Sequence, residues 1–422
     1  MHQTEHILFA TLLQLIVIVL AARIVGSLFR RFGQPAAVGE IVAGLLLGPS
    51  LLGHLLPGVS GFLFDPTSSM PITILSQIGL ILLMFQIGSD FEFGHLSHAR
   101  NRTAVIAIAI ASVAAPFCLG FAIGEVSAPI LAPGVNELAY SLFLGVALAI
   151  TAVPILGRIL REFDLTRTPI GAVAIAAAAI NDVTGWVLLA GISAFAAAQF
   201  SAAQTLLQVG GIVGFAVVLY LAGRPAVDWL LRRFPVVGGE LSPNLMAVTL
   251  ATLFGFAICT YLLGIFAIFG GFAAGLLYHR HHEFVAAWRH QVGRLVLVFF
   301  LPVFFTYTGL RTNMLGLTTQ ADWLWCLLIL GGAILGKILP SYLGARVAGF
   351  NAHEATVIGV LMNTRALMEL IVLNVGFDLG IIPQRVFTML VVMAVVTTIM
   401  TAPLLRIVLP RIGHAIPLRV EA

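Results

Sequence analysis

Long apolar stretches recur along almost the whole chain, and they limit its fold more than any other feature. Many contain 20 or more residues with few charges, as in 7–29 and 386–409. At 1.5 Å per residue, a helix of this length spans the roughly 30 Å hydrocarbon core of a bilayer. Charged residues make up only 9% of the 422 positions, and hydrophobic ones make up 60%. So few charges could not cover the surface of a soluble protein of this size, so we expect a membrane protein.

The apolar stretches predict an all-α polytopic protein with about 13 membrane-spanning helices. Their predicted ranges are 7–29, 37–52, 72–90, 103–124, 138–161, 169–199, 204–223, 243–263, 264–278, 294–312, 322–346, 353–376 and 386–409. Arginines gather in alternate loops, whereas the opposite loops hold only Arg311 and Arg385. By the positive-inside rule, this asymmetry places the N-terminus outside and the C-terminus inside. We expect a multi-pass protein of the cell membrane (plasma or inner membrane), without a cytoplasmic regulatory domain.

Two predicted spans are interrupted near their middles. The fifth carries Pro154 after Thr151, and the twelfth carries Asn363, Thr364 and Arg365. Proline removes a backbone donor, and a polar triplet of this kind is costly against lipid. Paired broken spans point to the binding site of a transporter, and they make spans four to six and eleven to thirteen look like inverted repeats. The alternative is a simple proline kink together with an unrelated polar contact.

Two ionisable residues lie deep within predicted spans and are functional candidates, since charge in hydrocarbon costs about 2.5–3.5 kcal/mol even on insertion scales. Asp182 follows Asn181 near the centre of span six, and Lys337 lies near the middle of span eleven. Of the 22 basic residues, Lys337 is the only lysine. Arginine stays protonated in proteins, whereas a buried lysine can lose its proton, so Lys337 is a candidate titrating partner of Asp182. The alternative is a permanent, structural Asp182–Lys337 ion pair.

We expect Asp182 to be the ion carrier. A carboxylate is a suitable hard ligand for an alkali cation, and a proton competes for the same oxygens. Binding of one excludes the other, which is what exchange requires. Asn181 adds an amide oxygen but no second charge.

Other charged residues receive supporting roles. Arg365 and Glu369 stand four apart, the spacing at which helical side chains meet, and are expected to neutralise each other and support the broken helix. Glu40, Asp90 and Glu92 could form a negative funnel for cations, although solvated helix ends also explain the latter two.

Several function classes find no support in the sequence. The run from His279 to Glu283 lacks metal-ligand spacing, so no metal beyond the transported alkali cation is expected, and the run could instead sense pH. No phosphate loop, dinucleotide fingerprint or nucleophile elbow is present, so we expect neither a cofactor nor an enzyme. The basic residues lie between spans and serve topology, not nucleic-acid binding.

Four segments in order resemble the monovalent cation:proton antiporter superfamily, in its second branch, which includes bacterial sodium and potassium antiporters and the plant cation/H⁺ exchangers. The segments are Val38 to Pro49, Thr151 to Leu156, Asn181 with Asp182, and Asn363 to Leu370. The resemblance covers about residues 7–410. It implies the sodium/proton antiporter fold, with two crossed broken helices and an ion site that includes Thr151.

The resemblance also implies a homodimer in which a core slides against a fixed dimerisation part and carries the ion across in an elevator-like motion. The dimerisation part would be about 1–100 and 235–315, the core about 101–200 and 316–410, and the linking helix about 204–234. Lys337 would pair with the ion-binding aspartate. Asn181 stands where electrogenic members have a second aspartate, which favours one-for-one exchange, and Ala152 stands where some sodium-selective members have a carboxylate.

The sequence therefore predicts a secondary antiporter that exchanges K⁺ or Na⁺ for H⁺. Its partners would be these ions, membrane lipid, a second copy of the chain and, for regulation, a possible separate subunit. The alternative is a sodium-coupled symporter of an organic anion on the same architecture. Such a symporter needs a roomier, more polar cavity than the Ala- and Ile-rich surroundings of Asp182 suggest.

Overall fold

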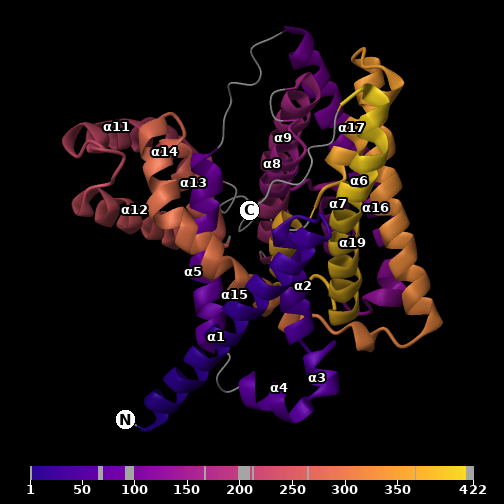
Figure 1. Ribbon diagram of the computed structural model, residues 1–422, viewed down its shortest axis with the longest axis horizontal. Coiled ribbons are helices and arrows are strands. Elements are labelled where there is room, and N and C mark those ends of the chain that lie inside the picture. The colour runs from indigo at the N-terminus through magenta and orange to yellow at the C-terminus, as the bar shows by residue number, and fades with distance from the viewer. Residues whose placement is uncertain are drawn as a thin grey trace. The chain divides into compact units, whose positions relative to one another are not determined.

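The computed structural model describes residues 2–64, 70–90, 99–165, 168–197, 210–211, 213–263, 266–365 and 367–414. These residues are almost entirely helical (Figure 1). Their one isolated β-bridge joins Val237 to Glu240. The all-α prediction is confirmed.

Ten helices of the described chain are long and apolar enough to cross a membrane, and one bent pair raises the count to eleven. The pair is α17 (Ala352–Met362) and α18 (Leu367–Asp378), which correspond to the twelfth predicted span. The fifth predicted span consists of α7 (Glu137–Ala149) and α8 (Val153–Glu162), and the ninth corresponds to α13 (Ala267–Tyr278). Each of these three helices is too short to cross by itself, which explains the difference from 13.

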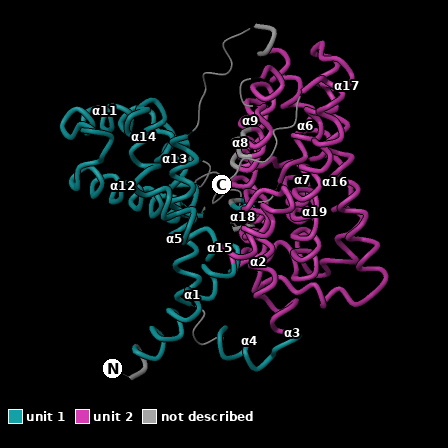
Figure 2. Tube along the Cα trace, viewed as in Figure 1, with its two compact units in different colours: residues 1–21, 55–92, 193–307 teal, residues 22–54, 93–192, 308–422 magenta. Residues whose placement is uncertain are grey.

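The chain divides into two compact units (Figure 2). The first comprises Met1–Ala21, Leu55–Glu92 and Ser193–Tyr307. Its helices are the first part of α1 (His2–Arg31), α4 (Pro57–Leu63), α5 (Met70–Ser89), α11 (Arg224–Arg233), α12 (Pro243–Leu262), α13, α14 (His282–Trp288) and most of α15 (Leu301–Arg311). Short π-type turns lie at Leu219–Gly223, Arg289–Gly293 and Val296–Phe300.

Close packing of α5 on α13 holds the first unit together. A Cβ atom added at Gly275 would lie 2.2 Å from the carbonyl oxygen of Phe85, so only glycine permits this approach. Beside the contact, the rings of Tyr278 and Phe284 stack with their centroids 4.4 Å apart, and Trp288 lies 4.5 Å from the Phe85 ring. The unit therefore has a small aromatic core of its own.

The second unit comprises Ala22–His54, Phe93–Ile192 and Thr308–Ala422. Its further helices are α2 (Ala36–Leu47), α3 (Leu52–Leu55), α6 (Ala99–Leu131), α9 (Pro169–Ala197), α16 (Gln320–Val347) and α19 (Gln384–Val408), with 3₁₀ turns at Met314–Gly316 and Leu409–Ile412. Two sets of helices share one layout. In each, a long helix (α6 or α16) is followed by a broken pair (α7 and α8, or α17 and α18) and then by another long helix (α9 or α19) (Figures 1 and 2). These sets are the predicted repeats.

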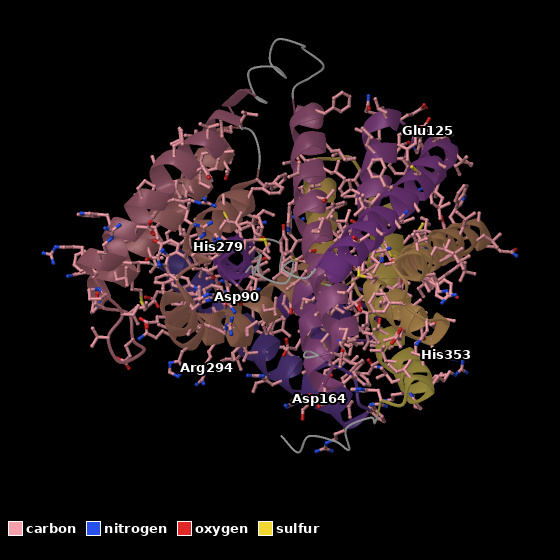
Figure 3. The ribbon with its side chains drawn as sticks, turned by 90° about the horizontal axis from the view of Figure 1, so that it is seen from above. Asp90, Glu125, Asp164, His279, Arg294 and His353 are labelled. Atoms are coloured by element: carbon pink, nitrogen blue, oxygen red, sulfur yellow. The ribbon has the colours of Figure 1, made fainter. Side chains whose placement is uncertain are left out.

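The broken helices lie in the interior, and apolar side chains of other helices lie on the outside. All residues of α18 from Leu367 to Gly376 are buried. By contrast, Leu335 and Leu339 of α16 are exposed. Lipid is as apolar as leucine, so an outward apolar surface suits a bilayer and leaves the interior free to hold polar groups. Some polar residues lie at helix ends, as Figure 3 shows for Asp164 after α8 and His353 at the start of α17.

Local sequence determines where the first broken pair is interrupted. Asn136 caps α7, because its side-chain oxygen accepts a hydrogen bond of 2.8 Å from the amide of Ala139. The helix ends at Ala149, and Pro154 is the second residue of α8. Proline is tolerated in a first turn, where the amide has no partner within the helix, but not in an interior. The chain is thus non-helical at 150–152.

The second broken pair begins with a capping box at the start of α17. The side chains of Asn351 and Glu354 each accept a hydrogen bond from the other's backbone amide at the start of α17. The helix ends at Met362, and α18 continues at an angle of 42°. The described residues of this break include no glycine or proline, so local sequence does not explain the break as it does in the first pair.

Candidate functional site

The two breaks cross and bond to each other. The amide of Ala152 donates a hydrogen bond of 3.0 Å to the carbonyl of Thr364. The hydroxyl of Thr151 donates to the carbonyl of Met362 at 3.1 Å. Backbone groups freed by each break are thereby satisfied by the other, as burial in a membrane protein requires. The predicted crossing of broken helices is confirmed.

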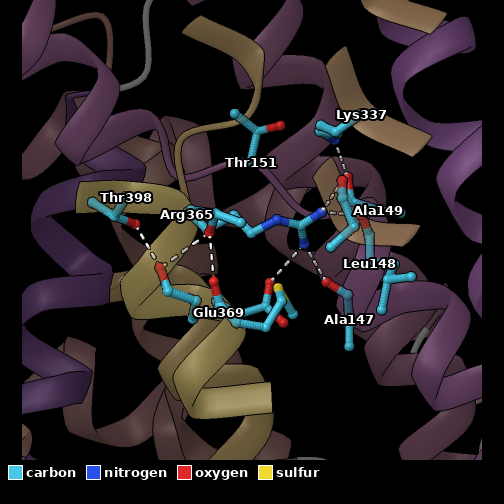
Figure 4. Close-up of polar contacts among 12 residues, drawn as sticks. Ala147, Leu148, Ala149, Thr151, Lys337, Arg365, Glu369 and Thr398 are labelled. Atoms are coloured by element: carbon cyan, nitrogen blue, oxygen red, sulfur yellow. Dashed lines mark hydrogen bonds and ion pairs between the residues drawn. The ribbon is translucent and has the colours of Figure 1, made fainter. Parts of the chain in front are cut away.

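Two buried cations cap the end of α7 at this crossing (Figure 4). Arg365 donates from Nη1 to the carbonyl of Ala147 at 2.7 Å and from Nη2 to that of Leu148 at 2.6 Å. Lys337 donates from Nζ to the carbonyl of Ala149. The last carbonyls of a helix have no partner within it and carry the negative end of the helix dipole, so cations are favourable there.

Arg365 and Glu369 form the ion pair that their spacing predicts. Nη1 lies 3.3 Å from Oε2, and both side chains are fully buried. Glu369 lies in the first turn of α18, where the helix dipole favours an anion. Nε of Arg365 and Oε1 of Glu369 have no hydrogen-bond partner among the described residues. Loss of either member would leave the other as an uncompensated buried charge, which is strongly destabilising.

Asp182, on α9, places its carboxylate at the start of α8. Its side chain is buried, and Oδ2 accepts a hydrogen bond of 3.3 Å from the amide of Val153, the first residue of α8. A helix N-terminus is a natural anion site. Among the described residues, Oδ1 has no hydrogen-bond partner. One oxygen is therefore held in place while the other remains available to a ligand.

Further polar groups without partners lie in the second break. Both polar atoms of the Asn363 side chain and Oγ1 of Thr364 are buried and have no hydrogen-bond partner among the described residues. Leaving such groups unpaired costs free energy, so they usually mark a place that takes a polar ligand. Thr364 is bonded through its carbonyl to Ala152, next to the residue that holds Asp182.

Asn181 is tied to α6. Its side-chain amide lies 2.8 Å from the hydroxyl of Ser112 and 3.4 Å from that of Thr151. When its oxygen faces Ser112, its nitrogen can also donate to the carbonyls of Ala109 and Ala177 at 3.2 and 3.3 Å. In this orientation both ends of the amide have hydrogen-bond partners. Asn181 thus joins α9 to α6 beside the carboxylate.

Lys337 does not pair with Asp182 in this structure. Its Nζ lies beyond the 4.0 Å ion-pair distance from the carboxylate and instead donates to the carbonyls of Ala149 and Ser112, the latter at 2.7 Å. The structural alternative of a permanent ion pair is therefore not what the structure shows. Ser112, which contacts both Lys337 and Asn181, is a site residue that the sequence analysis missed.

The remaining predicted residues lie elsewhere. Pro154 is in the first turn of α8, and Glu40 is buried within α2. Asp90, in the first unit, forms an ion pair of 2.7 Å with Arg289. Glu92 lies outside the described residues. The funnel of Glu40, Asp90 and Glu92 stays a prediction.

A bundle of membrane-crossing helices with two crossed broken helices, and a buried carboxylate at the crossing, defines a secondary transporter. Residues 16–409 match the family model described as "Sodium/hydrogen exchanger, transmembrane", and the chain belongs to this family.

Similar proteins agree with this assignment. The chain is 36% identical over 414 residues to the Na(+)/H(+) antiporter NhaS4 of Synechocystis, covering 96% of this chain and 99% of that protein. It is 34% identical to Cation/H(+) antiporter 17 of Arabidopsis thaliana, covering 95% of this chain but only 48% of that protein, so the chain spans about half of this plant relative. The sodium proton antiporter MjNhaP1 of Methanocaldococcus jannaschii has the same fold, with a TM-score of 0.67 at 16% identity over 96% of this chain and 98% of that one.

Proposed function

We propose that this multi-pass membrane protein exchanges a monovalent cation, K⁺ or Na⁺, for H⁺, and that Asp182 binds the two in turn. The observation that carries the proposal is the state of the carboxylate. Oδ2 is held by the amide of Val153, whereas Oδ1, buried at the crossing of the breaks, has no partner among the described residues. Relatives that bear the names Na(+)/H(+), K(+)/H(+) and cation/H(+) antiporter support the reaction type.

Competition for one carboxylate explains exchange. A dehydrated alkali cation needs hard oxygen ligands, and a proton on Oδ1 removes the charge that binds the cation. The hydroxyl of Thr151 donates to Met362, so its lone pairs can face a cation, and the amide oxygen of Asn181 lies close by. We propose that Thr151 and Asn181 complete the site around Asp182.

One-for-one exchange is the stoichiometry that the charges support. Asn181 is neutral, and Glu369 is already paired with Arg365. Among the described residues, Asp182 is then the one carboxylate at the crossing that is free to change its charge during transport. One proton for one cation moves no net charge, so membrane voltage should not shift the exchange equilibrium.

We further propose elevator-type alternating access in a homodimer. The core, about 101–200 and 316–410, would carry the ion site past the dimerisation part, about 1–100 and 235–315, with about 204–234 as the link. One of the two compact units of the described chain holds all residues of the ion site, which supports such a movement, although this unit also contains Ala22–His54 from the proposed dimerisation part. Cross-linking of the purified protein in membranes would test the dimer.

Transport in liposomes tests the function. We would reconstitute the purified protein, follow internal pH, and add Li⁺, Na⁺, K⁺ and Rb⁺ in turn. A pH change driven by K⁺ or Na⁺ alone is expected, and the ranking gives the selectivity. A response that requires an organic anion would favour the sodium-coupled symporter instead. An imposed voltage should leave the Na⁺ equilibrium unchanged, and a clear shift would show that a second group also cycles a proton.

A further inference from the structure

The Lys337 side chain occupies an acceptor site made of backbone carbonyls from two other helices. Nζ donates to the carbonyl of Ser112 in α6 at 2.7 Å and to that of Ala149 at the end of α7. The side chain is fully buried. A carbonyl oxygen inside a helix normally accepts a hydrogen bond from the amide four residues further on. Two helix carbonyls that instead accept from one lysine must each lack this amide partner.

Each of the two carbonyls has lost its partner within the helix for a separate reason. Ala149 is the last residue of α7, so no amide of that helix reaches its oxygen. Ser112 lies in the middle of α6, but the residue four positions on is Pro116, which has no N–H. The proline ring also clashes with the carbonyl four residues before it and turns that group away from the helix axis.

The packing of α16 on α6 fixes Lys337 over this spot. A Cβ atom added at Gly336 would lie 3.4 Å from Cα of Pro116 and 3.0 Å from the Leu119 side chain, so the helices meet closely there. Pro116 is buried. The hydroxyl of Ser112 meanwhile contacts the Asn181 amide at 2.8 Å, which connects this carbonyl site to the residue next to Asp182.

We propose that Pro116 is a positioning residue for exchange, because it frees the Ser112 carbonyl to hold the Lys337 ammonium away from Asp182. The inference rests on the proposed function of Asp182. A cation and the ammonium compete for one carboxylate, so whatever holds the ammonium elsewhere strengthens cation binding. Together, Pro116 and Ser112 thereby influence the affinity of Asp182 for the cation.

Replacing Pro116 by alanine tests this directly. The new amide can bond the Ser112 carbonyl and draw it back into α6, so the ammonium loses an acceptor and turns to Asp182. Loss of one hydrogen bond to a charged group should weaken cation binding about tenfold. Alanine favours a helix interior, so P116A should fold at least as well as wild type. If P116A does not fold, P116S supplies the same backbone amide and replaces it in the test.

The measurement is the rise in Tm caused by Na⁺ or K⁺, titrated on the purified full-length protein, for wild type, P116A, K337Q and the P116A/K337Q double variant. The control is P129A, which removes an exposed proline from the same helix. The proposal predicts a tenfold weaker apparent affinity in P116A, no change in P129A, and no effect of P116A once K337Q has removed the ammonium.

The results distinguish a failure of the role of Pro116 from a failure of the proposed function of Asp182. If P116A binds cations like wild type, or weakens binding equally with and without Lys337, the positioning role of Pro116 is wrong. If no cation stabilises even the wild-type protein, or D182N is stabilised as much as wild type, the proposed function fails instead.

Discussion

The two broken helices cross at one point, but the charged side chains that stabilise the two breaks come from different places. At the first break, the α7 carbonyls are held by two basic side chains, Lys337 from α16 and Arg365 from the second break. At the second, the end of α17 is satisfied by neutral donors, the hydroxyl of Thr151 and the amide of Ala152. The anions differ likewise. Glu369 belongs to α18 itself, whereas Asp182 reaches α8 from α9.

This difference separates the charged residues that hold the fold from those that take part in transport. The second break provides its own pair, Arg365 and Glu369, and uses it to hold the first break in shape. The charges that can still change partner, Asp182 and Lys337, both act on the first break. We therefore expect substitutions of the Arg365–Glu369 pair to lower stability and substitutions at Lys337 to change transport.

The largest effect is expected for R365Q. It removes the cap of Ala147 and Leu148 and leaves Glu369 as a buried, unpaired charge. Breaking a buried pair in this way costs about 3–5 kcal/mol, so Tm should fall strongly. E369Q serves as the partner variant. Thermal unfolding in detergent measures both, and lost transport with an unchanged Tm would move the pair from scaffold to mechanism.

The second effect concerns Lys337, where arginine keeps the charge and glutamine removes it. Because arginine stays protonated, K337R should hold Asp182 in a lasting ion pair and cripple exchange by about tenfold or more. K337Q removes the competing ammonium and should leave slower electroneutral exchange. Exchange rates of both variants across pH provide the comparison, and wild-type activity in K337R would make Lys337 a structural counter-ion.

A smaller effect is expected where the breaks bond to each other. T151V removes the hydroxyl that donates to Met362 and keeps the shape of the side chain. The lost hydrogen bond should cost about 1 kcal/mol of stability, and the cation should bind more weakly because an oxygen ligand is gone. T151S is the control, since it keeps the hydroxyl. Equal cation affinity in T151V and wild type would remove Thr151 from the site.

The smallest effect is expected at Asp90, far along the chain from either break. Its ion pair with Arg289 is partly exposed, with side-chain exposures of 31% and 57%, so it contributes no more than about 1 kcal/mol. D90N should change Tm and the apparent cation affinity little. Transport titrations with Na⁺ and K⁺ check this, and a large rise in KM would restore Asp90 to a cation funnel.

The sequence predicts elements and candidate charges well because both leave local signals. Apolar length reveals the spans, Pro154 reveals the first break, and the spacing of Arg365 and Glu369 reveals their ion pair. Contacts between distant segments leave no such signal. Arg365 caps Ala147, which is 218 residues away, and nothing near either residue says so.

Lys337 shows the same limit at the site itself. Its place in a span marks it as functional, but which acceptor it uses depends on which carbonyls the packing brings near. Ser112 could have been found only through Pro116, since a proline in the middle of a span always frees the carbonyl four residues before it. The signal exists in the sequence, but its partner is visible only in the fold.

D182N tests most directly whether Asp182 carries the cation and the proton in turn. Asparagine has almost the same shape but can neither take up the proton nor neutralise the cation. We would compare Na⁺- and K⁺-driven pH changes in liposomes for wild type, D182N and D164N, a control at an exposed aspartate. We expect wild-type exchange in D164N and less than about a tenth of it in D182N, with an unchanged Tm. Exchange by D182N above that level would contradict this role of Asp182.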